Sequence, residues 1–334
     1  MRDRSDHRPT MGDIAEAAGV SQMTVSRVLR GSGSASAEAR ARVEQAAHQL
    51  GYVPNRLATA LRDESTPLVA VILPTLGNRV FSEVLAGVTE TLAGQGMQPV
   101  FGVTEYDPLR EAALVRDLLS WRPRGIILPG LEHAKGTRAA IRASGVRVAE
   151  VMDLDGDPIS VAFGLSQVEA GRATARHMLA RGYRRFGWIG AQGGRDLRAS
   201  KRLAGFRETV RAAGAQMVAE RVFDGPSAMV QGRRGTAMLL DGLARPDAIY
   251  FANDDLAAGG LMHCLAEGLT VPRDVALAGF NGLGFLEALP VRLTTVETPR
   301  REMGISAARH VMGDGPVAEA KVDLGFRLVA GETS

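Results

Sequence analysis

Polar side chains gather where apolar runs of this chain end, and their types suit ligand binding. The segments concerned are LPTLGNRVF (73–81), VMDLDGD (151–157), LSQVE (165–169), GAQGGRDLRASKR (190–202), YFANDD (250–255) and GFNG (279–282). They supply amides, hydroxyls, carboxylates and guanidinium groups, all of which can hydrogen-bond a small polar molecule. Because ligands of open parallel sheets bind at the carboxyl ends of the strands, we expect these segments to line one cleft.

The sequence shows no residue pattern typical of an enzyme or a metal site. A single cysteine, Cys264, excludes an internal disulfide and a cysteine-based zinc site, and it suits a buried apolar position better than a nucleophile. The six histidines are scattered at positions 7, 48, 133, 177, 263 and 310. No Ser-His-Asp, metal-ligand or paired-carboxylate arrangement stands out, so we expect no catalytic residue, no metal and no cofactor.

Continuous apolar runs alternate with amphipathic helical stretches from Leu68 to residue 313. The runs are 68–74, 99–103, 125–130, 146–152, 186–190, 247–251 and 275–280, and the helical stretches include 81–94, 108–120, 167–181, 200–213 and 254–267. Uninterrupted apolar strands are typical of parallel sheets covered on both faces. We therefore predict an α/β core of doubly wound parallel sheets, and its length favours two lobes with a cleft between them.

The first fifth of the chain has a different texture, with short helical segments and no strand pattern. Thr10 can cap a helix that stops at Gly19, and Ser21 can cap a second helix after a short turn. This outline is that of a helix-turn-helix, and a third helix is expected at about 37–50. An ordinary helical bundle is the alternative, but Gln22 and Met23 lie where a recognition helix first meets base edges.

The net charge of +3 is concentrated in this segment. Residues 1–62 carry nine arginines against six carboxylates, so the remainder of the chain is neutral overall. An excess of positive charge near a helix-turn-helix favours a polyanionic partner. Arginine-rich composition alone is a weak indicator, because lysine occurs only at positions 135, 201 and 321.

The segments IAEAAGVSQMTVSRVLRG (14–31) and LGYVPNRLATAL (50–61) resemble the DNA-binding headpiece and hinge of the LacI family of bacterial transcriptional regulators. The resemblance implies that Gln22 and Met23 read bases, through a bidentate pair with adenine and an apolar contact respectively. Arg27 suits guanine or a phosphate. The expected phosphate contacts are Thr10, Ser21, Thr24, Ser26 and Asn55.

The resemblance also implies a hinge helix at 55–62 that folds only on DNA. Six or so residues cannot hold a helix alone in water. In the family, paired leucines wedge into the minor groove, which gives Ala58 and Leu61 a DNA-binding role here. Packing of Leu61 on the next domain is the alternative.

The remainder of the chain resembles the LacI-family core, which has the fold of periplasmic sugar-binding proteins. The matching segments include RLAGF (202–206), FANDDLAAG (251–259), VPRDVALAGF (271–280) and LTTVETPRREMG (293–304). Within the family the chain is most similar to the gluconate-operon repressor branch, particularly at NRVFSEVLAGV (78–88) and VDLGFRLVAG (322–331).

On this resemblance Arg202 is the cation of the cleft, able to hold a carboxylate or hydroxyls with a forked pair of hydrogen bonds. A surface arginine in a basic run with Arg195, Arg198 and Lys201 is the alternative, and core packing is an alternative for Phe81. The expected effector-binding residues are Asn78, Val80, Phe81, Asp153, Ser166, Arg202, Asn253, Asp254 and Asn281.

The sequence departs from the common family pattern at two places in the cleft. Many relatives carry Asp where Asn281 stands, and an Asp-Asn pair where Ser166 and Gln167 stand. Both changes remove negative charge, which favours an anionic effector such as gluconate or a phosphorylated sugar acid over a neutral sugar.

We thus predict a homodimeric regulator, typically a repressor, that binds palindromic double-stranded operator DNA under the control of a sugar acid. The expected domains are a helix-turn-helix headpiece (8–54), a hinge helix (55–62), a core N-subdomain (66–161 and 292–317) and a core C-subdomain (162–291 and 318–334).

Two other functions fit parts of the sequence. A sugar-binding transport component would need an export signal that the first thirty residues do not show, and no run could span a membrane, so a cytoplasmic protein is expected. A nucleotide-dependent oxidoreductase could use GWIGAQGG (187–194), but this segment lacks the G-x-G-x-x-G order.

Overall fold

A computed structural model describes residues 9–29, 35–53, 65–314 and 319–334 of the chain. The chain divides into two compact units, Met1–Glu64 and Ser65–Ser334. Among the described residues, no helix is long and apolar enough to cross a membrane. The predicted hinge helix at 55–62 lies outside the described residues.

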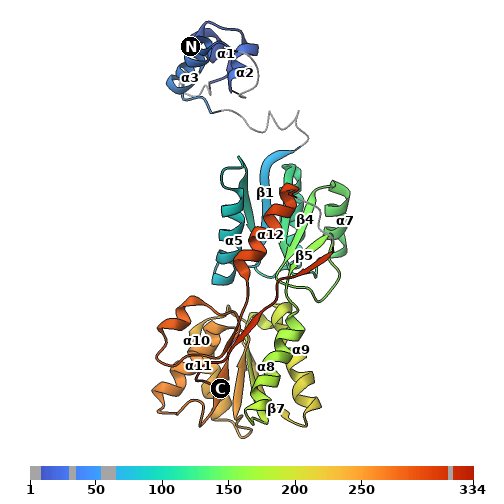
Figure 1. The fold of residues 1–334 in the computed structure, drawn as a ribbon, viewed down its shortest axis with the longest axis vertical. Coiled ribbons are helices and arrows are strands. Elements are labelled where there is room, and N and C mark those ends of the chain that lie inside the picture. Colours follow the sequence, from blue (N-terminus) through green and yellow to red (C-terminus); the bar gives the residue numbers. More distant parts are fainter. Residues whose placement is uncertain (1–8, 30–34, 54–64, 315–318) are drawn as a thin grey trace. The chain divides into compact units, whose positions relative to one another are not determined.

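Three helices lie in the described part of the first unit, α1 (Met11–Ala18), α2 (Gln22–Leu29) and α3 (Ala37–Gln49) (Figure 1). A capping box joins Thr10 to Asp13 at the start of α1, and Gly19 ends this helix in the left-handed conformation with φ 63°. Ile14, Val25 and Val43, one from each helix, are fully buried against one another. The predicted helix-turn-helix unit is therefore confirmed.

The second unit has two lobes, and the first lobe is built on a six-stranded parallel sheet in the order β11-β5-β4-β3-β1-β2. Its strands are β1 (Thr66–Leu73), β2 (Gln98–Val103), β3 (Pro123–Pro129), β4 (Arg147–Val151), β5 (Val161–Gly164) and β11 (Lys321–Asp323). Its helices are α5 (Arg79–Leu92), α6 (Pro108–Ser120), α7 (Lys135–Ser144) and α12 (Arg300–Met312).

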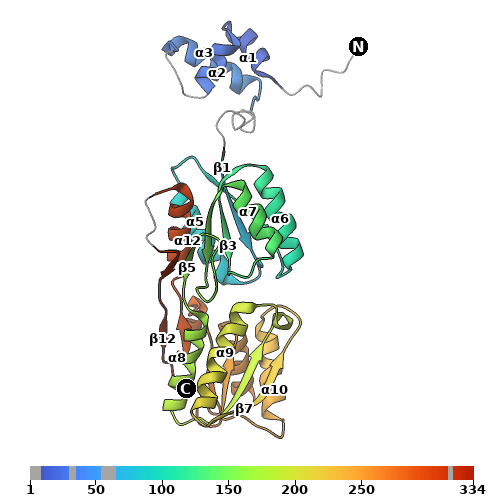
Figure 2. The ribbon, with the colours of Figure 1, turned by 90° about the vertical axis from the view of Figure 1, so that its right-hand side faces the viewer.

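Helices cover both faces of this sheet, with α5 and α12 on one face and α6 and α7 on the other (Figure 2). In strand β1, side chains on both faces of the sheet are buried under these helices. Val69, Val71 and Leu73 pack against α5 and α12, whereas Ala70 and Ile72 pack against α6 and α7. Because both faces of the strand are buried, its sequence is apolar throughout rather than alternating.

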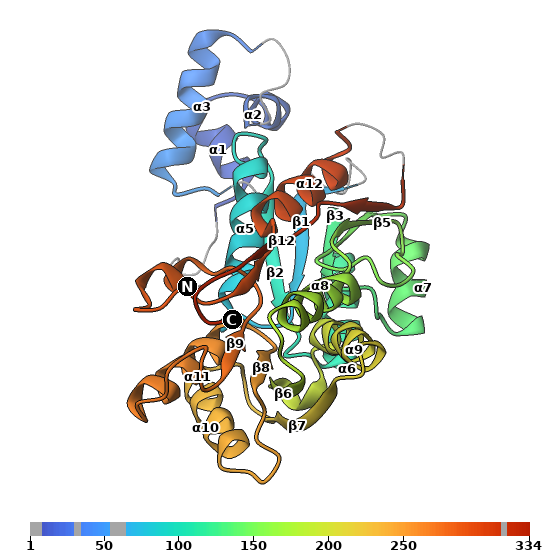
Figure 3. The ribbon, with the colours of Figure 1, turned by 60° about the horizontal axis from the view of Figure 1, so that its bottom comes forward.

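The second lobe has a four-stranded parallel sheet in the order β7-β6-β8-β9, with α8 and α9 on one face and α10 and α11 on the other (Figure 3). Its strands are β6 (Arg185–Gly190), β7 (Gln216–Val222), β8 (Ala248–Phe251) and β9 (Ala276–Ala278). Its helices are α8 (Gln167–Ala180), α9 (Leu197–Ala212), α10 (Met229–Leu240) and α11 (Asp254–Ala266). Two short 3₁₀ turns, Gln192–Gly194 and Gly284–Ala288, complete it.

The chain passes between the lobes three times: after β5, at β10 (Thr295–Glu297), and between β11 and β12 (Arg327–Val329). Strands β10 and β12 pair antiparallel beside the cleft. The predicted doubly wound parallel lobes are confirmed. The pairing differs from the predicted subdomain boundaries, however: β5 and β11 belong to the sheet of the first lobe, whereas the prediction places residues 162–164 and 321–323 in the C-subdomain.

Candidate functional site

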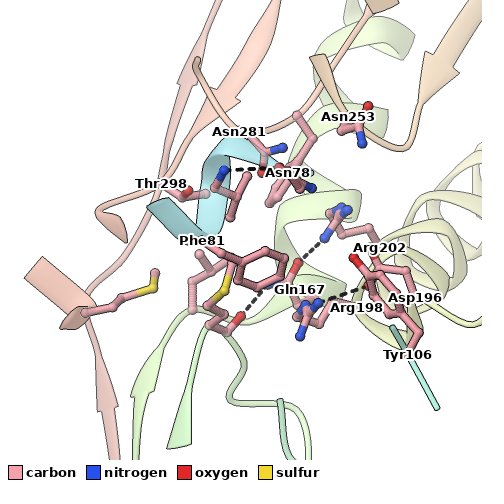
Figure 4. A pocket seen from close by; sticks show the side chains of 15 residues that line it. Asn78, Phe81, Tyr106, Gln167, Asp196, Arg198, Arg202, Asn253, Asn281 and Thr298 are labelled. Carbon is pink, nitrogen blue, oxygen red and sulfur yellow. Dashed lines mark hydrogen bonds and ion pairs between the residues drawn. The ribbon is translucent and has the colours of Figure 1, made fainter. Parts of the chain in front are cut away.

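A pocket lies between the two lobes, at the carboxyl ends of their strands (Figure 4). Asn78, Val80 and Phe81 reach it from the first lobe, and Arg202 and Asn253 from the second. The other residues that line it are Tyr106, Met152, Leu165, Gln167, Asp196, Arg198, Phe280, Asn281, Thr298 and Met303. Five of the strand-end segments that the sequence places at the cleft supply most of its polar side chains.

Four helices begin at this pocket and turn their N-termini toward it. The side chains of Asn78, Asp196 and Asn253 cap α5, α9 and α11 by accepting backbone N–H hydrogen bonds, and Gln167 is the first residue of α8. The N-terminal end of a helix carries a partial positive charge. The four ends together favour negative charge in the pocket.

Arg202 is the central cation of the pocket, and only 5% of it is exposed. One Nη donates to Gln167 Oε1, the other donates to the carbonyl of Ala252 at 2.9 Å, and the guanidinium lies 3.8 Å from the centre of the Phe280 ring. Its Nε is buried and has no partner among the described residues, and none of their carboxylates lies within ion-pair distance. Burial lowers the pKa of Arg202.

Close packing of α8 on α9 fixes the position of Arg202. A Cβ atom at Gly171 would lie 1.9 Å from the Arg202 carbonyl oxygen, and one at Gly205 would lie 2.1 Å from the carbonyl oxygen of Val168. At these two positions there is room only for the hydrogen atom of glycine, so the backbones of α8 and α9 are in direct contact. As a result Gln167 at the start of α8 meets Arg202 on α9.

A second arginine, Arg198, lies one helical turn before Arg202 on the same face of α9. Its guanidinium is 3.5 Å from Asp196 and 5.6 Å from the centre of the Phe81 ring. Figure 4 shows Arg198, Asp196 and Tyr106 grouped at one side of the pocket. The pocket thus contains two guanidinium groups and one lining carboxylate, so it carries an excess of positive charge.

Six of the nine predicted effector-binding residues line the pocket, namely Asn78, Val80, Phe81, Arg202, Asn253 and Asn281. The alternative of a surface arginine is excluded for Arg202 by its burial. Asn281 has a φ of 126°, a strained conformation for a side chain other than glycine. Such strain is common at binding sites, and here the Arg300 guanidinium, by donating to the Asn281 carbonyl, helps to hold it.

The other three predicted residues, Asp153, Ser166 and Asp254, do not line the pocket. Asp153 is fully buried in an ion pair with Lys201, and Ser166 caps α8 and donates to Asp155 at 2.7 Å. Asp254 accepts from Thr295 Oγ1 at 2.6 Å and from the backbone of Leu283 at 2.9 Å. Burial raises the pKa of Asp254 to about 6, with these hydrogen bonds opposing the rise. These three side chains therefore make contacts within the structure behind the pocket and do not face the space that a ligand would occupy.

Five polar lining residues were not predicted: Tyr106, Gln167, Asp196, Arg198 and Thr298. The spacing of Arg198 and Arg202, four residues apart, could have placed both on one face of a helix. Gln167 follows Ser166 directly, but successive residues at a helix start point in different directions. Tyr106 lies three residues after β2, outside the six strand-end segments that the sequence places at the cleft.

In the first unit, α2 presents an exposed polar face. Gln22, Met23 and Arg27 are exposed and Thr24 is partly buried, and Met23 is 64% exposed despite being apolar. A Cβ atom at Gly12 would lie 3.0 Å from Gln22 Nε2, so this amide rests against the start of α1.

The other predicted contact residues of this unit are the exposed Thr10 and Ser21, which cap helices, and the partly buried Ser26. Asn55, Ala58 and Leu61 lie outside the described residues.

Two family models match the chain. The model for bacterial regulatory proteins of the lacI family covers residues 10–55, and a periplasmic binding protein-like domain covers residues 175–334. The chain is 38% identical to the HTH-type transcriptional regulator GntR of Pseudomonas aeruginosa, over 99% of this chain and 97% of that protein. The chain belongs to the LacI family.

Solved structures of LacI-family proteins agree with this assignment. A LacI-family transcriptional regulator from Silicibacter pomeroyi superposes with a TM-score of 0.92 at 42% identity, covering 97% of this chain and 99% of that one. The lac repressor dimer bound to operator and the anti-inducer ONPF superposes with a TM-score of 0.83 at 25% identity, covering 98% and 99%. As a LacI-family member, the chain is a DNA-binding transcriptional regulator rather than an enzyme.

Proposed function

We propose that this regulator is a homodimeric repressor of sugar-acid catabolism whose affinity for a palindromic operator is controlled by a sugar acid, such as gluconate, bound in the pocket between the lobes. The buried guanidinium of Arg202 carries the proposal. A buried cation without a counter-ion is costly, and an incoming carboxylate would remove that cost through charge-assisted hydrogen bonds.

The remainder of the pocket supports an anionic, hydroxyl-bearing ligand. Asn78, Asn253 and Asn281 offer amide donors and acceptors for hydroxyls, while Phe81 and Phe280 supply apolar walls. Gln167 and Asn281 stand at positions where acidic side chains would repel a carboxylate. A neutral sugar would leave the charge of Arg202 unmatched.

On the DNA side, we propose that Gln22 and Met23 read bases, that Arg27 contacts guanine or phosphate, and that Thr10, Ser21, Thr24, Ser26 and Asn55 contact phosphates. The exposed polar face of α2 supports this assignment. We further propose that Ala58 and Leu61 of the hinge enter the minor groove. One headpiece contacts few bases, so high affinity needs two copies on a two-fold symmetric site.

The proposal is tested by measuring gluconate binding with the Arg202→Met variant. Methionine fills the space of the arginine stem without its charge. Loss of a hydrogen-bonded charge pair costs about 1.5–3 kcal/mol, or roughly a tenfold to hundredfold weaker Kd by calorimetry. Operator binding, followed by fluorescence anisotropy, should persist but no longer respond to gluconate.

Arg207→Met on the same helix is the matched control, because Arg207 is exposed and pairs with Glu220 outside the pocket. It should leave gluconate binding as in the unmodified chain. Equal gluconate affinity of the Arg202→Met variant and the unmodified chain would contradict the proposal, as would a preference of the unmodified chain for neutral sugars.

A further inference from the structure

The side chains of Tyr106 and Arg198 stand between two cavities. The inner cavity is the pocket around Arg202, and an outer cavity of about 90 Å³ adjoins it, with Thr104, Glu132 and Arg195 in its wall. Tyr106 and Arg198 are the two residues that line both. Tyr106 comes from the first lobe and Arg198 from the second, so together their side chains separate the inner cavity from the outer one.

The backbone holds Tyr106 rigidly in this position. Both Glu105 and Tyr106 adopt the left-handed conformation, with φ values of 54° and 59°, which side chains other than glycine rarely adopt. Asp107 follows at once and caps α6, accepting from the backbone of Leu109 at 2.8 Å, and its own N–H donates to the Thr104 carbonyl at 3.1 Å. The tyrosine ring is thus fixed by a turn and a helix start.

Arg198 is buried and contacts Tyr106 directly. Its guanidinium lies over the Phe81 ring and donates to the Tyr106 hydroxyl, and its one carboxylate partner among the described residues is Asp196, at the long distance of 3.5 Å. Burial and the Asp196 carboxylate raise the pKa of the Tyr106 hydroxyl, while Arg198 and Arg202 oppose the rise, so these four groups lie close together. The contact between Tyr106 and Arg198 therefore lies at the boundary between the two cavities.

The inner cavity is too small for a sugar acid as it stands. Its free volume of about 20 Å³ is close to that of a single water molecule. Binding therefore requires side chains to move or the lobes to separate. With Tyr106 held by its turn, a ligand longer than the inner cavity would have to pass the tyrosine ring to reach the outer one.

We propose that Tyr106 determines the maximum length of the effector. The inference rests on the proposed sugar-acid function and adds a size limit to it. Tyr106 is a specificity-determining residue, because its ring separates the compartment that accepts a short acid from the space that a longer acid would need.

The test compares two acids that share one anionic end, gluconate and the disaccharide acid lactobionate. The ratio of their dissociation constants is measured by calorimetry for the unmodified chain and for Tyr106→Ala, with melting curves to confirm folding. In the unmodified chain lactobionate should bind at least about tenfold more weakly than gluconate. In Tyr106→Ala the two cavities join, and the ratio should fall by about tenfold or more.

Tyr106→Phe keeps the ring and should keep the ratio within about twofold of the unmodified chain, as should Leu109→Ala, whose exposed side chain lies outside both cavities. Equal affinity of the unmodified chain for the two acids, or an unchanged ratio in Tyr106→Ala, would overturn the length limit while leaving the sugar-acid function intact. Failure of both acids to bind any of these proteins would overturn both proposals.

Discussion

His133 is a buried histidine of the first lobe whose two ring nitrogens are both surrounded by hydrogen-bond acceptors. Its Nδ1 lies 2.8 Å from Glu111 Oε1, and its Nε2 lies 3.2 Å from the carbonyl of Gly130 and 3.5 Å from Glu150 Oε1. Both ring nitrogens therefore face acceptors, which a neutral imidazole cannot satisfy with its single N–H. The geometry requires a protonated histidine that ties α6 to the ends of β3 and β4.

This arrangement predicts a loss of stability at alkaline pH. Burial alone would lower the pKa of His133, but Glu111 and Glu150 raise it to about 9, above its value in the unfolded chain. The stabilisation is thus complete below about pH 6.5 and disappears as the pH rises through about 9. Melting temperatures between pH 6 and 10 should fall more for the unmodified chain than for His133→Gln. Parallel curves for the two proteins would contradict the protonated state.

Gln22 allows the DNA-reading proposal to be tested at one residue. Gln22→Ala should cost about 1–3 kcal/mol of discrimination between operator and altered sites, because a bidentate contact to a base is lost. Anisotropy titrations with matched duplexes measure it, and binding to random duplex should change little. Gln45→Ala, exposed on α3, is the control. An equal loss of affinity for every duplex would instead indicate a phosphate contact.

The sequence identifies the chemistry of the pocket better than the direction of each side chain. The three asparagines could be found because they follow strand ends, where a parallel sheet collects its ligands, whereas Arg202, on α9, was found through the family resemblance of RLAGF (202–206). Asp153 and Asp254 lie in the same loops but turn inward to Lys201 and Thr295. Neighbouring residues such as Asn253 and Asp254 point in different directions, and no local signal in the sequence distinguishes the two.

At the scale of elements, the crossing of α8 and α9 decides whether Gln167 meets Arg202. Gly171→Ala would place a methyl group against the Arg202 carbonyl, so the helices must separate. We expect the free energy of unfolding to fall by about 1–3 kcal/mol and gluconate binding to weaken. Urea denaturation and calorimetry measure the two effects.

Gly136→Ala is the matched control for this change. A Cβ atom at Gly136, within α7, would meet nothing within 4 Å, so this substitution should stabilise the protein by about 0.5–1 kcal/mol through the higher helix propensity of alanine. If both glycine substitutions shift stability in the same direction, the close crossing does not explain the effect.

The elements that the sequence revealed are those with continuous apolar runs, such as β1, β3 and β8. Strand β7 was not predicted because it lies at the edge of its sheet and is largely exposed, so its sequence, QMVAERV, mixes polar and apolar residues. Strand β5 has only four residues. It pairs with β4 on one side and with β11, more than 150 residues later, on the other, and no local pattern encodes the second pairing.

At the scale of the whole second unit, Lys201 joins the two lobes. From α9 its Nζ donates to Glu132, to Asp153 and, at 2.7 Å, to the carbonyl of Asp155, all in the first lobe. Asp153 is fully buried, so Lys201→Met would leave its charge without a partner. We expect a lower melting temperature and weaker gluconate binding, because the lobes are held together less firmly.

A double substitution separates the bridge from simple packing. Adding Asp153→Asn to Lys201→Met removes the unpaired charge and should recover part of the lost stability, so that the two effects are not additive in a double-mutant cycle. Strict additivity of the two single substitutions would show that the pair does not act as a bridge.

Because the chain passes between the lobes three times, the order in which the ribosome adds residues limits how far each lobe can fold during translation. The first sheet gains its edge strand β11, and the second lobe gains the buried side chain of Thr333, from residues that a ribosome adds after all the other strands of each sheet. Neither lobe can therefore be finished during translation of the preceding three hundred residues. A nascent chain halted shortly before residue 321 should expose an open sheet edge, and it should be a better substrate for chaperones and proteases than the released protein.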